Sequence, residues 1–240
     1  MEFADRGLRV VSPDRPGYGG SSPQPGRTMS DWPKDVVRLA DALGIDRFIV
    51  AGHSSGGPYA IACAALLPNR VSGAIVLAGV TDMAWPEALN GYFEAEIAMM
   101  RMPDEQSVLV RCEELYGADG SGLLRLSGIH LPAPDVALLS DKKMANAMFA
   151  SITEAFRQGI GGYAQDIFVQ GKAWPFVPGA ITTPTMLVHG KLDTIVPVAH
   201  SCHTAELIPE SSLQILPGHG HISISLELPN LCAEMIQSLE

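Results

Sequence analysis

Short apolar runs alternate with segments of helical periodicity in the N-terminal third of the chain. The apolar runs are bounded by turn residues and predict strands at 8–11, 47–51 and 72–79. Between them, Ser30 or Asp31 can cap a helix that ends at Gly44, and residues 56–67 form a second apolar helix. Strands that alternate with helices predict a mostly parallel sheet with helices on both faces.

The pattern changes in the middle of the chain. Helical periodicity continues without a convincing strand at 86–100, 104–115, 134–156 and 163–169. The alternation then resumes, with strands at 185–188 and 212–216 and helices at 198–207 and from about residue 229. We therefore expect an α/β core formed by residues 1–80 and 184–240, with a helical cap inserted at 81–183.

The sequence VAGHSSGGP at 50–58 lies between a predicted strand and a predicted helix. A Gly-x-Ser-x-Gly match also occurs by chance in loops, but this context favours a strained turn that exposes the hydroxyl of Ser54. Gly52 and Gly56 are expected to remove side chains that would collide there. The backbone amide of Ser55, at the start of the helix, can donate to a developing oxyanion. Ser54 is thus the candidate nucleophile.

A serine nucleophile needs a base and a group that orients the base. His221 lies in the glycine-rich loop GHGH after a predicted strand, and we favour it over its neighbour His219. Asp193, directly after the strand at 185–188, is the candidate acid, with Asp82 as the alternative. The competing interpretations are a solvent-exposed loop histidine and a turn or capping aspartate.

The composition is that of a globular chain, with 240 residues, 47% hydrophobic, 18% charged and a formal net charge of −10. No run of lysine and arginine is present, which argues against nucleic acid or an anionic membrane as partner. No apolar stretch has the length of a membrane span, and MEFADRG is not a signal peptide. We therefore expect a cytoplasmic protein whose partner is a small-molecule substrate.

Neither a metal nor a cofactor is expected. The four cysteines have no metal-ligand or redox spacing and are interpreted as free thiols. His200 and His203 could share a helix face, but no third ligand of obvious spacing accompanies them. The run GYGG follows a predicted strand, yet Ser22 stands where a dinucleotide fingerprint has its third glycine.

The runs RVVSPDRPGYGGSS, AGHSSGG, HGKLDTIVP and GHGH occur in this order, and together they resemble the α/β-hydrolase superfamily in its cap-bearing serine hydrolase branch. The resemblance implies that Ser54, Asp193 and His221 are nucleophile, acid and base, and that the Ser55 amide is half of an oxyanion hole. The serine disfavours the haloalkane dehalogenase and epoxide hydrolase branches, which have an aspartate at that position.

The N-terminus departs from the family pattern. Members usually begin with three further strands, the third ending in a His-Gly loop that supplies the second oxyanion amide, and these are missing here. The predicted strand at 8–11 would then have no hydrogen-bonding neighbour. A missed upstream start, a fragment or a rearranged sheet would each explain this, and we favour the first.

The substrate is expected to be a small, largely apolar carboxylic ester. Six of the ten methionines lie in the predicted cap, where methionine is more often core but can also accept varied apolar groups: Met83, Met99, Met100, Met102, Met144 and Met148. Glu94 or Glu96 could instead bind a substrate amine, as in an aminopeptidase-like enzyme that cleaves a peptide or amide. A ligand-binding receptor, or a catalytically impaired member of the fold, is the alternative outside hydrolysis.

Overall fold

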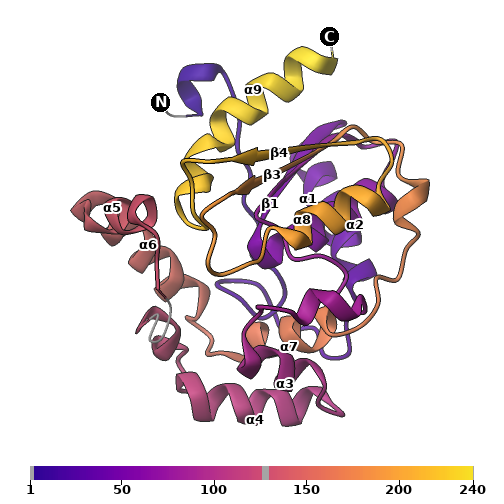
Figure 1. Ribbon diagram of the computed structural model, residues 1–240. Coiled ribbons are helices and arrows are strands. Elements are labelled where there is room, and N and C mark those ends of the chain that lie inside the picture. Colours follow the sequence, from indigo (N-terminus) through magenta and orange to yellow (C-terminus); the bar gives the residue numbers. More distant parts are fainter. Residues whose placement is uncertain (1–2, 126–129, 240) are drawn as a thin grey trace.

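The computed structural model of the protein describes residues 3–125 and 130–239 (Figure 1). One sheet contains β1 (Phe48–His53), β2 (Val71–Leu77), β3 (Thr185–Gly190) and β4 (Ser211–Leu216), hydrogen-bonded in that order. All three strand pairs are parallel. The α/β fold with a parallel sheet is therefore confirmed.

Helices cover both faces of this sheet because β2 alternates its side chains between two cores. Ala74 and Val76 face the cluster formed with α2 (Gly57–Leu66), whereas Ile75 and Leu77 face Leu231 and Met235. The first face also carries α1 (Trp32–Ala42) and α8 (Ala199–Leu207), and the second carries α9 (Leu228–Leu239) (Figure 1). A strand buried on both faces has a continuous apolar run, and β2 shows one from Ala74 to Leu77.

Helices fill the interval between β2 and β3: α3 (Glu94–Met100), α4 (Glu105–Tyr116), α5 (Ala133–Ser140), α6 (Lys142–Ala155) and α7 (Gly161–Gln170). We call these the cap helices. The helices α3, α4 and α7 share a second apolar core that includes Met99, Met100 and Val108. No strand lies among the described residues of this interval.

Two helices that the sequence pattern predicts as continuous are divided. The predicted helix 86–100 is a 3-10 turn at Pro86–Leu89 followed by α3, with Gly91 at φ +77° between them. The predicted helix 134–156 is α5 and α6, because Asp141 adopts an extended backbone and its carboxylate accepts the amides of Lys143 and Met144. The side chain of Asp141 thus caps a new helix.

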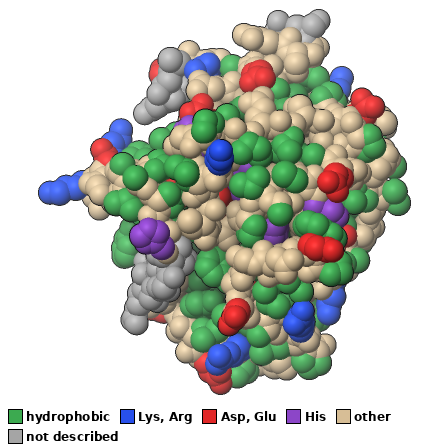
Figure 2. All heavy atoms as spheres, in the orientation of Figure 1, with side chains coloured by type: hydrophobic (Ala, Val, Ile, Leu, Met, Phe, Trp, Pro, Cys, Tyr) green, Lys and Arg blue, Asp and Glu red, His purple; other side chains and the backbone are tan. Residues whose placement is uncertain are grey.

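The helices α5 and α6 pack mainly against each other and form an arm that projects to one side of the molecule (Figure 1). Hydrophobic side chains remain at the surface of this arm (Figure 2). The exposed residues include Val136, Met144 and Phe149. No helix in the described ranges is long and apolar enough to cross a membrane.

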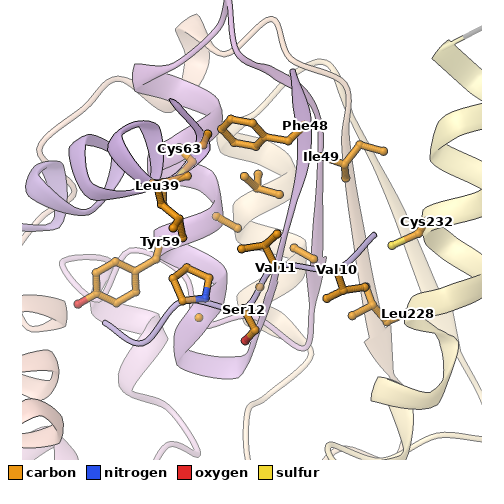
Figure 3. A pocket seen from close by; sticks show the side chains of 18 of the residues that line it. Val10, Val11, Ser12, Leu39, Phe48, Ile49, Tyr59, Cys63, Leu228 and Cys232 are labelled. Atoms are coloured by element: carbon orange, nitrogen blue, oxygen red, sulfur yellow. The ribbon is translucent and has the colours of Figure 1, made fainter. Parts of the chain in front are cut away.

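The prediction of a strand at 8–11 is wrong. These residues form no strand, and Val10 and Val11 keep 57% and 41% of their surface exposed. A groove of about 790 Å³ lies between this segment and the outer edge of β1, with Val10 and Val11 on one wall and Phe48 and Ile49 on the other (Figure 3). A parallel ladder needs a neighbour about 4.8 Å away, and the groove leaves the segment without one.

A buried aspartate connects the loop before α1 to the cap helices. The carboxylate of Asp166, on α7, accepts hydrogen bonds from Tyr18 at 2.9 Å, Tyr59 at 2.6 Å and Arg15 at 2.6 and 2.9 Å, and from Arg27. Burial opposes its ionisation, but the charges of Arg15 and Arg27 outweigh burial and hold the pKa of Asp166 below its ordinary value. The ion pairs therefore stabilise the attachment of α7 to the core.

Substituting Asp166→Asn is expected to lower the free energy of unfolding by about 3–5 kcal/mol, because two arginines lose their buried partner. In the wild type, a carboxyl with a lowered folded-state pKa stabilises the fold above its ordinary pKa of 3.8, and this contribution is lost as the pH falls through the folded-state value. Urea unfolding between neutral and acidic pH measures both effects. Asp35→Asn, in the exposed pair with Arg38, is the control and should change little.

Candidate active site

The turn after β1 holds Ser54 in a strained conformation. Its φ is +56°, and only one other described non-glycine residue, Ala78, has a positive φ. A single 3-10 turn, Ser54–Gly56, then leads directly into α2. The predicted strain at Ser54 is confirmed, and it places the serine between the end of a strand and the first turn of a helix.

The glycines around Ser54 have different roles. A Cβ on Gly52 would lie 2.3 Å from the carbonyl oxygen of Gly56, so only glycine fits there. A Cβ on Gly56 would meet nothing within 4 Å, and the prediction that this glycine relieves a collision is wrong. The second crowded position is Gly57, whose Cβ would lie 2.9 Å from Gly79 Cα, where α2 approaches the chain that follows β2.

His221 and Asp193 are brought together by the loops after β4 and β3. His221 is 5% exposed, and its Nδ1–H donates to Asp193 Oδ2 at 2.7 Å. The other carboxylate oxygen accepts the amides of Ile195 at 2.8 Å and Val196 at 2.9 Å. Burial opposes ionisation of Asp193, but hydrogen bonds from His189 and His221 outweigh it and hold its pKa well below the usual range. The carboxylate therefore stays charged and fixes the imidazole.

His189 supports the same carboxylate, a role that sequence reasoning missed. It is completely buried, and its Nε2 lies 3.1 Å from Asp193 Oδ2 and 3.0 Å from the carbonyl oxygen of Val196. Two acceptors at Nε2 require the proton on that nitrogen, which leaves Nδ1 to accept the hydroxyl of Ser201 at 2.7 Å. The only signal in the sequence was a polar residue near the end of an apolar strand.

His53 packs against the other side of His221. The two rings are 4.7 Å apart between centroids, and His53 Nε2–H donates to the carbonyl oxygen of His221 at 2.8 Å. Burial, with a smaller effect from His221, lowers the pKa of His53 to about 4, so its ring is neutral near pH 7. His53 is the last residue of β1, directly before Ser54.

Ser54, Asp193 and His221 all follow the carboxyl ends of parallel strands and therefore share one edge of the sheet. Acid and base are hydrogen-bonded, whereas no hydrogen bond joins the hydroxyl of Ser54 to any described residue. The amide of Ser55 lies in the first helical turn, where backbone donors have no partner within the helix. The groove beside β1 is also lined by Ser54 and Ser55 and so reaches this edge.

The alternative residues lie elsewhere. His219 Nδ1 is 3.3 Å from the carbonyl oxygen of Ser223, and its Nε2 is 3.6 Å from Glu227. Asp82 accepts the amides of Ala84 at 2.9 Å and Trp174 at 3.2 Å. Neither of them contacts the Asp193–His221 pair, so the geometry favours the first-choice residues.

His200 and His203, the pair considered as metal ligands, bind protein groups. His200 Nδ1 accepts the amide of Thr81 at 3.2 Å, and its Nε2–H donates to the carbonyl oxygen of Ala88 at 2.9 Å. His203 Nδ1 lies 2.8 Å from the hydroxyl of Thr81, and its ring stacks on Trp85. Both histidines thus attach the chain after β2 to α8.

The matching family model is that of the Alpha/beta hydrolase family, and it covers residues 1–235. The chain therefore belongs to the alpha/beta hydrolase family, which confirms the superfamily, the fold and the enzyme class expected from the motifs.

Individual relatives are distant. An uncharacterized hydrolase, YcgS, from Bacillus subtilis is 25% identical over 224 residues, which cover 91% of this chain and 77% of that protein. A non-heme haloperoxidase from Rhodococcus erythropolis is 25% identical over 251 residues, covering 99% and 84%. The structure of a thermophilic esterase from Thermogutta terrifontis matches with a TM-score of 0.66 at 20% identity over 93% of this chain and 77% of that one. At this identity the structural likeness shows the fold alone.

Replacing Gly52 by alanine is expected to lower the free energy of unfolding by about 2–3 kcal/mol, because the added methyl group collides with backbone at 2.3 Å. Gly56→Ala is the matched control, since its methyl group meets open space in helical backbone and should cost nothing or stabilise by up to about 1 kcal/mol. Urea unfolding of the two variants measures the difference. Equal losses would contradict this account of the turn.

Proposed function

We propose that the protein is a serine hydrolase that cleaves a small, largely apolar carboxylic ester through an acyl-enzyme on Ser54. The observation that carries the proposal is the 2.7 Å hydrogen bond between His221 and Asp193 at the sheet edge where Ser54 is held at φ +56°. A strained serine, a base and a charged acid at one edge are the parts that acyl transfer needs.

Each residue then has a defined task. His221 Nε2 takes the proton of the Ser54 hydroxyl as its oxygen attacks the ester carbonyl, and the Ser55 amide donates to the oxyanion that forms. His221 next gives the proton to the leaving alcohol, and water attacks the acyl-enzyme by the same route in reverse. Asp193 accepts from Nδ1–H throughout, so Nε2 is the nitrogen that exchanges protons with the reacting groups.

An apolar substrate is supported by the groove that reaches Ser54, whose labelled lining is mainly apolar (Figure 3). The cap methionines give less support, because Met83, Met99 and Met100 are buried in the core of the cap helices. An amine-binding role for Glu96 is also weakened. Its carboxylate already accepts the hydroxyl of Tyr163 at 2.6 Å, and burial raises its pKa, so ionisation of Glu96 is less favourable than that of an exposed glutamate.

Intact-mass analysis after exposure to a fluorophosphonate, together with steady-state assays of p-nitrophenyl esters, tests the proposal. One adduct and sustained turnover are expected, and Ser54→Ala should abolish both. Slow single turnover with retained ligand would favour a receptor, and cleavage of aminoacyl anilides alone would favour an amide substrate. A folded protein that forms no adduct would contradict the proposal.

The choice of acid is tested separately. Asp193→Asn is expected to slow fluorophosphonate labelling of Ser54 by about 10⁴-fold, because an amide does not stabilise the imidazolium and favours the wrong tautomer. Asp82→Asn, which alters the alternative acid, should leave the labelling rate unchanged because the side chain of Asp82 accepts the amides of Ala84 and Trp174, away from His221. The opposite ranking of the two variants would assign the role to Asp82.

A further inference from the structure

The loop that carries His221 is attached to a buried carboxylate from the cap helices. Asp135, near the start of α5, is completely buried. Its Oδ1 accepts the amide of Ser223 at 2.8 Å and the hydroxyl of Ser223 at 2.6 Å, and its Oδ2 accepts the amide of Ile222 at 3.2 Å. Asp135 is 86 residues from His221 in the sequence, so nothing local explains these bonds.

The same contact holds the residue before His221. The amide of Gly220 donates to the hydroxyl oxygen of Ser223 at 2.9 Å, and this hydroxyl in turn donates to Asp135. A Cβ on Gly220 would lie 2.5 Å from Asp135 Oδ2 and 2.5 Å from Pro132 Cγ, so a side chain there would push the aspartate away. The backbone on both sides of His221 is therefore fixed by Asp135, and the second glycine of GHGH is required by this packing.

The loop that carries Asp193 is attached to the segment directly before α5. Thr194, next to Asp193, donates its hydroxyl to the carbonyl oxygen of His130 at 2.8 Å. Residues 130–135 thus contact the loops of both the acid and the base. The first turn of α5, together with the residues directly before it, therefore connects the α5–α6 arm to the loops of the acid and the base.

The direction of the Asp135 carboxylate indicates what it stabilises. A buried carboxylate is costly unless donors surround it, and an aspartate at a helix start usually accepts amides of its own helix. Here α5 has no side-chain cap, and the hydrogen bonds found for the carboxylate come from the His221 loop. The hydrogen bonds of Asp135 therefore stabilise the conformation of that loop.

We propose that Asp135 is a positioning residue that acts through His221 and couples the α5–α6 arm to the catalytic base. The inference rests on the proposed function, which makes His221 the base. Proton transfer from Ser54 and to the leaving group both require the imidazole at a defined place, and a displacement of about 1 Å can cost roughly a hundredfold in rate. Displacing the arm would move Asp135 and, with it, the backbone on both sides of His221.

The test compares Asp135→Asn with Asp141→Asn. The first puts an amide group against the Ile222 or Ser223 donors, whereas the second alters an exposed carboxylate of the same arm whose bonds go to Lys143 and Met144. We expect Asp135→Asn to lower kcat and the fluorophosphonate labelling rate by about ten- to hundredfold with KM unchanged. Asp141→Asn should leave kcat, the labelling rate and KM unchanged.

A second variant, Ser223→Ala, removes only the hydroxyl bridge between Gly220 and Asp135. It should lower kcat less than Asp135→Asn, and it replaces that variant if Asp135→Asn does not fold.

A spectroscopic measurement separates positioning from activity. The Nδ1 proton of His221, hydrogen-bonded to Asp193, gives a downfield proton NMR resonance that is assigned by its loss in His221→Gln. Asp135→Asn and Ser223→Ala should shift or broaden it, and Asp141→Asn should not. If the variants at 135 and 223 keep both kcat and this resonance, the positioning role is wrong. If the wild type is never labelled, the proposed function fails, while the resonance still decides whether Asp135 fixes His221.

Discussion

The hydrogen bond between His221 Nδ1 and Asp193 Oδ2 joins two loops that meet only because β3 and β4 are neighbouring parallel strands. It is short, and both partners are almost completely buried, so each needs further support. Asp193 is supported by two backbone amides and by His189. His221 is supported by His53 and by the contacts of Asp135 with its loop. Much of the polar structure at this sheet edge serves to keep one imidazole in place.

Buried carboxylates connect segments that are distant in the chain at several places in this molecule. Asp166 connects α7 to the loop before α1 and to α2, Asp135 connects α5 to the loop of the base, and Asp193 connects the loops of acid and base. Each accepts at least three hydrogen bonds, which offset the cost of removing a charge from water. Hydrogen bonds to a carboxylate are directional, so they hold two segments in a defined relative position. Apolar packing fixes that position less strictly.

The outer edge of β1 has the opposite character. Its neighbour across the groove forms no strand, and the apolar side chains of that segment remain partly exposed. The loops that carry Asp193 and His221 follow β3 and β4, which lie away from this edge, and the contact of β1 with them that we describe is that of its last residue, His53, with His221. The serine turn is the part of the site next to the outer edge of β1, and its geometry is held by the contacts of Gly52 and Gly57 with backbone.

Features that depend on short stretches of chain could be predicted from the sequence. These are the alternation of strands and helices, the strained turn at Ser54, and the loops that carry Asp193 and His221. Periodicity and turn chemistry act over a few residues, and the order of four motifs was enough to indicate the family. The three-dimensional arrangement was needed to see that His189 and Asp135 support the pair, that Gly57 and not Gly56 is crowded, and that residues 8–11 form no strand. Each of these results depends on what lies opposite a residue in space, and a buried hydrogen bond or a strand pair is set by a partner that is distant in the chain.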